Sequence, residues 1–452
     1  MKVYDKNILK KNLEKHDTIK SFKNVKNILF QTILEDLALA KSEKVMAWKY
    51  MIEHIKMHYL YQRGMYDECL QHFEILHKIK EKDSSASSSF LYTRYQYMYF
   101  EQLQLSRKTK NSIEKIEKEY DNSIEEILLE NKILKAVFHL NILRLDILNL
   151  SFVDSSPKIL AYKKKYIDVI PARVESPNIK LMSSFYYLLI SYNILEKNFD
   201  KSLSYTGEYI SLFNEKNKIK NFIHEYINAL LFAAGIRIIT SDTKDSSVYL
   251  DKQAEVLADT TLTNYNSIYA YAVWCSNTIQ TYIIEEKWNT LIEFLNKNEG
   301  IYRDKTTSIA VKFYFDVDFS FAKAHFFLKE FEKCFYYLDK IIAFYSPISK
   351  EYNSLLLAAK TLYILINIEM GNFESNEYAI DNLYQSLQRN NIAIEYDQIT
   401  LKELKKLNSK GSTLKQADYT VALQKIEQNN TLDRLESYTT KTSIKKWLAI
   451  KS

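Results

Sequence analysis

The stretch Lys329–Ile342, KEFEKCFYYLDKII, decides the fold that the sequence predicts. The aromatic residue Phe331 follows a short polar turn, and apolar or small residues recur three, four and seven positions after it. Residues with this spacing lie on one face of an α-helix. The stretch therefore predicts a turn followed by an amphipathic helix.

Four other stretches share this pattern, so it marks a repeat. They begin at Gly64, Lys197, Glu286 and Gly371 and read GMYDECLQHFEIL, KNFDKSLSYTGEYI, EKWNTLIEFL and GNFESNEYAIDNLY. The five aromatic anchors are separated by 133, 89, 43 and 42 residues: Tyr66, Phe199, Trp288, Phe331 and Phe373. The gaps are near multiples of about 44, and weaker matches near Thr109, Ser156 and Thr243 fill the missing places. About eight units then tile residues 45–390.

A second apolar helical stretch precedes each anchor, for example IKLMSSFYYLLISYNILE from Ile179 and NSLLLAAKTLYILINIEM from Asn353. Each unit is therefore expected to be an antiparallel helix hairpin. One hairpin alone cannot bury both of its apolar faces, so neighbouring hairpins must stack. The predicted fold class is all-α, a right-handed α-solenoid of stacked hairpins.

The stretches KNFDKSLSYTGEYISL and KEFEKCFYYLDKIIAF resemble the second helix of a tetratricopeptide repeat. In that family a turn and an aromatic residue are followed, three positions later, by a small residue where the two helices approach closely. The corresponding small residues are Cys69, Ser112, Ser202, Ser246 and Cys334. The repeat departs from the family's 34 residues and implies longer helices. The resemblance implies a binding scaffold, because the family shares no catalytic residues.

The two ends of the chain are expected to be basic helical caps, at residues 1–44 and 391–452. Residues 1–26 carry 8 lysines against 3 acidic residues, and residues 402–452 carry 11 Lys and Arg against 5. The stretch Ser21–Ala40 is amphipathic and suits a cap on the first apolar face. Within the body, Pro157, Pro171 and Pro177 crowd one region, where they are expected to stop helices.

Composition excludes several classes of protein. With 6 glycines and 4 prolines in 452 residues, neither an all-β sandwich nor a glycine-rich phosphate loop can be assembled. The 3 cysteines lie far apart, which argues against disulfides and a cysteine zinc site. The sequence shows no signal peptide and no membrane span, so a cytoplasmic location is expected. No nucleophile or metalloprotease motif is present, and the prediction is a non-enzymatic protein without a cofactor.

Three histidines of the first hairpin, His54, His58 and His72, are the weak candidates for a metal site. His54 and His58 are four residues apart and share a helix face, as zinc ligands often do. The apolar stripe of the next helix points His72 away from them, so surface histidines are the favoured interpretation and no metal is predicted.

Tyrosine is abundant, with 35 residues, and many tyrosines fall on first helices of the predicted hairpins. First helices of such solenoids line the concave surface, where tyrosine gives rigid contact area for a partner. The candidate partner-binding residues are Tyr95, Tyr99, Tyr187, Tyr192, Tyr269 and Tyr271. The predicted function is a scaffold or adaptor that binds a protein or peptide on that surface. The alternative is a nucleic-acid-binding or regulatory repeat protein that uses its basic ends.

Overall fold

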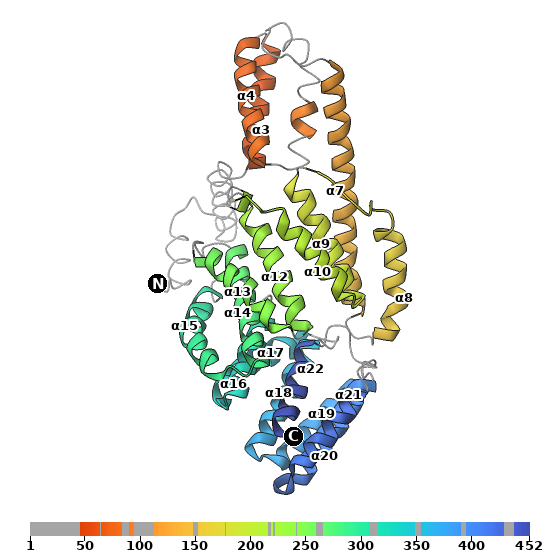
Figure 1. Ribbon diagram of the computed structural model, residues 1–452, viewed down its shortest axis with the longest axis vertical. Coiled ribbons are helices and arrows are strands. Elements are labelled where there is room, and N and C mark those ends of the chain that lie inside the picture. The colour runs from red at the N-terminus through yellow and green to blue at the C-terminus, as the bar shows by residue number, and fades with distance from the viewer. Residues whose placement is uncertain are drawn as a thin grey trace, which may run out of the picture. The chain divides into compact units, whose positions relative to one another are not determined.

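The computed structural model describes residues 46–63, 65–83, 90–94, 113–147, 152–176, 178–215, 218–219, 222–240, 242–258, 265–306, 315–348, 354–389, 395–428 and 438–452. Every regular element in these ranges is helical, which confirms the predicted all-α class (Figure 1). In the same ranges, no helix has the length and apolar character needed to cross a bilayer. The chain divides into two compact units, Met1–Leu128 and Leu129–Ser452.

Among the residues of the first unit that the structure describes, α3 (Met46–Gln62) and α4 (Tyr66–Asp83) form a helix hairpin. Met57, Phe73 and Leu76 are buried between its helices. The unit also includes the beginning of α7 (Ile113–Ile147), where the hydroxyls of Thr93 and Ser123 share a hydrogen bond of 2.8 Å.

The second unit contains the rest of α7 and a series of helix pairs that follow one another along the chain. Its further helices are α8 (Phe152–Tyr162), a π-helical turn (Lys163–Ile167), α9 (Ile179–Leu195), α10 (Phe199–Ser211), α12 (Ile223–Ile239), α13 (Thr243–Ala258), α14 (Tyr265–Ile284), α15 (Trp288–Thr306), α16 (Phe315–Phe327), α17 (Phe331–Ile348), α18 (Ser354–Met370), α19 (Phe373–Arg389), α20 (Glu395–Lys410), a 3-10 turn (Gly411–Thr413), α21 (Gln416–Gln428) and α22 (Tyr438–Lys451). Chain neighbours from α9/α10 to α18/α19 pack as pairs, and α12, α14, α16 and α18 also contact each other in succession.

The same type of turn joins the two helices of every pair named above, including α3/α4. After the first helix, a backbone N–H reaches back to the carbonyl oxygen five residues earlier, over 2.8 to 3.0 Å. The donors are Met65, Asn198, Asp242, Lys287, Glu330 and Asn372. The residue before the donor has a left-handed backbone at Lys197, Glu286, Lys329 and Gly371, with φ between 57° and 77°. This is the usual C-terminal cap that satisfies the last carbonyls of a helix and reverses the chain.

Four residues after each of these amides, a buried residue brings the two helices together. The Cys69 thiol and the Ser202 and Ser246 hydroxyls donate to backbone carbonyl oxygens twelve residues earlier, over 3.3 to 3.5 Å. The buried Cys334 occupies the same place, so four of the predicted small positions lie at the hairpin contact; Ser112 lies outside the described residues. The sequence pattern missed two equivalents, Leu291 and Asn376, and the Asn376 amide donates to the Ile364 carbonyl over 3.1 Å.

The two helices of a pair differ in how they are buried. In α16 and α18 most described residues are buried on every side of the helix, including the polar Asp318, Lys323 and His325 of α16. Their partners α17 and α19 bury one stripe and leave the opposite face to solvent. A helix that is apolar on every side belongs inside a structure, and an amphipathic one belongs at its surface. The first helices therefore form the core of this unit, and the second helices cover it.

Between residues 113 and 167 the chain departs from the hairpin repeat. α7 continues without a break for 35 residues, and α8 runs through Pro157. The expectation that Pro157 stops a helix was wrong. A proline inside a helix removes one backbone hydrogen bond, and here other contacts hold α8 in place. One of them is the buried Tyr162 hydroxyl, which donates to the Ala136 carbonyl of α7 over 2.7 Å.

Larger side chains at Ser202 and Cys334 should destabilise the fold, because both residues are fully buried between paired helices. We expect Ser202→Leu and Cys334→Phe each to lower the free energy of unfolding by about 1 to 3 kcal/mol, and Cys334→Ala to have a mild effect. Urea denaturation followed by circular dichroism measures both changes. If the two large substitutions leave the midpoint unchanged, the helices do not meet at these positions.

Glycine at the left-handed positions should stabilise the protein. A side chain at positive φ is disfavoured by about 1 kcal/mol, so Lys197→Gly and Lys329→Gly should each raise the free energy of unfolding by about that amount. The reverse change, Gly371→Lys, should lower it, since a Cβ there meets only an ordinary contact with Phe373 and the cost is conformational. Thermal denaturation of the three variants is the measurement. Destabilisation by both glycines would contradict the left-handed turns.

Candidate functional site

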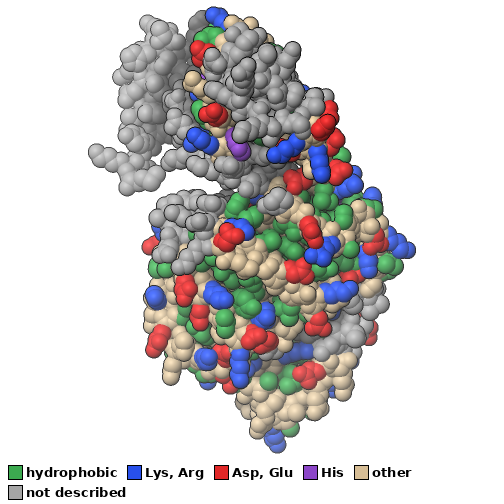
Figure 2. All heavy atoms as spheres, turned by 45° about the horizontal axis from the view of Figure 1, so that its top comes forward, with side chains coloured by type: hydrophobic (Ala, Val, Ile, Leu, Met, Phe, Trp, Pro, Cys, Tyr) green, Lys and Arg blue, Asp and Glu red, His purple; other side chains and the backbone are tan. Residues whose placement is uncertain are grey.

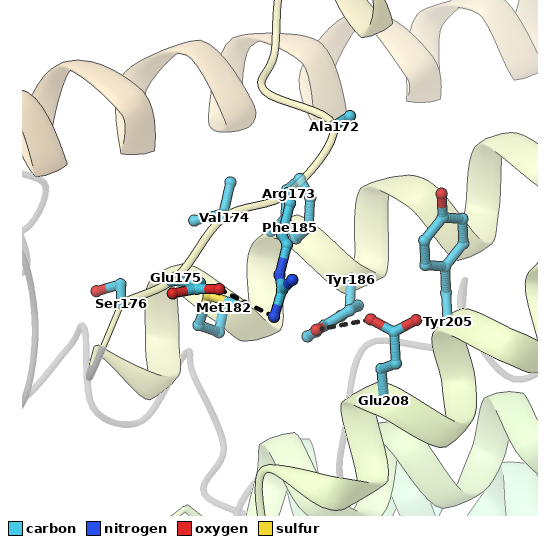
Figure 3. Close-up of a pocket in the computed structure, with 10 residues that line it drawn as sticks. All are labelled: Ala172, Arg173, Val174, Glu175, Ser176, Met182, Phe185, Tyr186, Tyr205 and Glu208. Carbon is cyan, nitrogen blue, oxygen red and sulfur yellow. Dashed lines mark hydrogen bonds and ion pairs between the residues drawn. The ribbon is translucent and has the colours of Figure 1, made fainter.

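A cavity of the second unit lies where residues 172–176 pass over the α9/α10 hairpin (Figure 3). The cavity has a volume of about 940 Å³. The residues that follow this segment include Asn178, the N-cap of α9. The Asn178 side chain accepts a hydrogen bond from the Leu181 N–H. The Ser176 hydroxyl in turn accepts from the Asn178 N–H over 3.0 Å. The capping hydrogen bond of Asn178 thus fixes the residue at which α9 begins.

The floor of the pocket is aromatic and carries one ordered polar pair. Met182, Phe185 and Tyr186 come from α9, and Tyr205 and Glu208 lie one turn apart on α10. The Tyr186 hydroxyl donates to a Glu208 carboxylate oxygen over 3.1 Å, as the dashed line in Figure 3 shows. Burial, together with the Glu208 charge, raises the pKa of Tyr186 to about 12. The phenol therefore stays protonated at neutral pH and keeps donating to Glu208.

The rim adds charges of both signs. Arg173 and Glu175 form an ion pair of 2.9 Å with side chains that are 85% and 75% exposed. A pair this exposed contributes little to stability and can exchange partners readily. Tyr205 is half-buried and Glu208 is exposed, so both side chains can reach a ligand from α10. The pocket thus combines an aromatic floor with one guanidinium and two carboxylates.

Of the six tyrosines proposed from the sequence, the four that the structure describes, Tyr187, Tyr192, Tyr269 and Tyr271, do not line this pocket. Tyr95 and Tyr99 lie outside the described residues. Tyr192 and Tyr271 are buried and donate hydrogen bonds to Glu196 and to the Asn298 side chain. Tyr187 is half-buried and meets the Phe232 ring edge-on, whereas Tyr269 is 39% exposed.

Tyr186 and Tyr205 line the pocket, and neither is among the six candidates proposed from the sequence. Tyr186 precedes the candidate Tyr187, and adjacent residues on a helix point about 100° apart. No periodic signal marks Tyr205. Its role depends on where residues 172–176 cross the hairpin, which local spacing does not reveal.

The histidines of the first hairpin do not converge on one point. The rings of His54 and His58 are 6.1 Å apart, and His72 pairs with Glu53 over 2.6 Å. His58 contacts Gln62 at 2.9 Å. Burial and the nearby positive charges of His58 and Arg94 lower the pKa of His54. Within the described ranges, no three His, Cys, Asp or Glu side chains are grouped so as to hold a metal ion.

A second polar cluster, here called the clasp, lies in the core between three helices. It consists of Glu299 of α15, His325 of α16, Tyr337 of α17 and Glu330 in the α16–α17 turn. The His325 ring is 1% exposed, with Nδ1 at 2.7 Å from Glu330 and Nε2 at 3.4 Å from Glu299. The Tyr337 hydroxyl donates to Glu299 over 2.7 Å. Each member of the clasp contacts another member, so we infer a structural role for it.

The clasp should make stability dependent on acid. Burial opposes ionisation of Glu299, but contacts with His325 and Tyr337 and the Arg303 charge outweigh it and lower its pKa below the ordinary 4.5. A lowered carboxyl pKa stabilises the fold above the ordinary value, and this contribution is lost as the pH falls through the folded-state value. We expect Glu299→Gln to cost about 1 to 3 kcal/mol of unfolding free energy at pH 7 and progressively less below pH 4.5.

The exposed Glu332, in the first turn of α17, provides the matched control. Glu332→Gln should change stability little at either pH. Urea denaturation at several pH values distinguishes the two variants. An equal loss for Glu299→Gln at neutral and acid pH would show that packing, not charge, holds the clasp.

Comparison of the sequence with protein-family models gives no match, and comparison with curated proteins gives no significant match either. The functional interpretation therefore rests on the residues and geometry described above.

Proposed function

We propose that this protein is a non-enzymatic helical-repeat scaffold or adaptor, and that the pocket beneath residues 172–176 binds a peptide segment of a partner protein. The proposal includes the right-handed superhelical path and the helical caps expected from the 44-residue repeat. It is carried by one observation: an open pocket of about 940 Å³ with an aromatic floor lies on a stack of hairpins.

The chemistry of the pocket suits a peptide. Aromatic side chains contribute apolar contact area with few rotatable bonds, and tyrosines are typical of residues that dominate binding energy. The flexible thioether of Met182 can adapt to the shape of a bound segment. Glu208 and the Arg173–Glu175 pair can accept from and donate to the backbone and side chains of an extended segment. The Tyr186–Glu208 hydrogen bond fixes one wall before any ligand arrives, which lowers the entropy lost on binding.

The alternative, nucleic-acid binding by the basic ends, has less support. Lys446 and Lys451 of the C-terminal basic segment form ion pairs with Glu286 and Glu369. On the face drawn in Figure 2, basic and acidic side chains of the described residues are interspersed. Phosphate recognition favours clustered positive charge and loses affinity steeply with salt. A salt titration therefore separates the two functions.

Alanine at Tyr205 should weaken partner binding without unfolding the protein. The partner is first identified by pull-down on the intact chain with mass spectrometry, and its binding segment is then titrated. We expect Tyr205→Ala to lose about 2 kcal/mol of binding free energy and to keep the melting temperature. Glu208→Gln keeps the shape of the pocket and tests its charge.

Tyr269→Ala is the control, because this tyrosine is 39% exposed and lies outside the pocket. It should bind as the unaltered chain does. Equal affinity of the Tyr205→Ala and unaltered proteins would exclude the pocket as the binding site.

A further inference from the structure

The helix α22 lies against parts of the chain that are far from it in sequence. It packs on α18 and on α21, and the three helices lie close together in Figure 1. Its Lys446 reaches the turn between α14 and α15, 160 residues away, where the ammonium group contacts Glu286 at 2.5 Å and the Ile284 carbonyl at 3.3 Å. The contacts thus involve one hairpin turn and two other helices, α18 and α21. The surface formed by the α14–α15 turn, the end of α18 and α21 is called here the α22 groove.

The apolar side of α22 is fully inserted into this groove. Ile444, Trp447 and Leu448 are at most 3% exposed. The Trp447 ring meets the Tyr419 ring of α21 edge-on, with centroids 5.5 Å apart. These residues occupy positions i, i+3 and i+4 of the helix, the spacing of an amphipathic helix bound in a groove.

Polar contacts fix the helix in register. One carboxylate of the groove, Glu369, accepts a hydrogen bond from the Trp447 indole N–H over 2.7 Å and one from Lys451 over 2.9 Å. Its side chain is only 12% exposed, so these bonds are made largely away from water. The two lysines are separated by five residues, or about 7.5 Å along a helix. The groove therefore presents two carboxylates, Glu286 and Glu369, that match lysines at i+2 and i+7.

We propose that the α22 groove is a recognition site for a basic amphipathic helix, that α22 occupies it within the chain, and that a partner protein's helix of the same pattern replaces α22. The partner is defined by chemistry: apolar residues at i, i+3 and i+4, with tryptophan at i+3, and lysines at i+2 and i+7. The charges of the groove and of the helix are complementary, and charge pairs at a rim select partners and fix register. This site is separate from the pocket beneath residues 172–176, and neither proposal depends on the other.

Competition between α22 and an added helix gives the proposal a distinctive test. A helix that must displace α22 binds with an apparent affinity reduced by the fraction of chains whose groove is free. Weakening α22 inside the chain must then strengthen binding of the added helix. The probe is a fluorescent synthetic peptide of residues 438–452, titrated into the full-length chain and followed by anisotropy.

We expect Trp447→Ala in the full chain to tighten peptide binding at least ten-fold relative to the unaltered chain. Adding Glu369→Gln to that variant should weaken binding at least ten-fold, and a peptide carrying Trp447→Ala should not bind. Ile450→Ala is the matched control: this side chain is 47% exposed on α22, and its loss should leave peptide binding unchanged. Lys451→Ala, which removes a partly exposed side chain, replaces Trp447→Ala if that variant does not fold.

Three results would overturn the proposal. Peptide binding that is not saturable in the Trp447→Ala or Lys451→Ala chain would show that the groove does not accept a separate helix. Binding unaffected by Glu369→Gln would place the peptide elsewhere. Formation of dimers that exclude the peptide, seen by light scattering, would identify the occupant as α22 of a second copy rather than a partner's helix.

Discussion

The close contact between the two helices of each hairpin, made four residues after the turn, is the constraint on which the rest of the structure depends. At Cys69, Ser202, Ser246 and Asn376 a side chain donates to the carbonyl twelve residues earlier, and the preceding turn closes through the same backbone hydrogen bond. Turn and contact together fix the register of both helices. Once the register is fixed, first helices such as α16 and α18, which are buried on most sides, can be covered only by stacking against their neighbours.

The two candidate binding surfaces arise where this regular stack is interrupted. The pocket forms where residues 172–176 enter α9 and cross a hairpin whose face holds Tyr186, Tyr205 and Glu208. The α22 groove forms where the α14–α15 turn, the end of α18 and α21 meet, with Glu286 and Glu369 at its edges. A buried clasp around His325 joins α15, α16 and α17.

Local periodicity predicted the all-α class, the aromatic anchors and the small residues Ser202 and Cys334, because these depend on contacts within one hairpin. It did not reveal that Asn376 and Leu291 occupy equivalent places, since neither is small. It also placed a helix end at Pro157, where contacts from α7 outweigh the missing hydrogen bond. The pocket and the α22 groove join residues tens to more than a hundred positions apart. Such juxtapositions depend on how hairpins stack, which spacing along one helix does not encode.

Amide hydrogen exchange at the hairpin turns tests the shared register most directly. The N–H groups of Asn198, Lys287, Glu330 and Asn372 lie between helices, yet each donates to a carbonyl of the helix before it. An amide bonded within a cooperative unit exchanges only when that unit opens. We therefore expect these four amides to exchange as slowly as those inside the helices they follow. Exchange at the rate of unprotected loop amides would contradict the common turn and, with it, the stack of hairpins built on it.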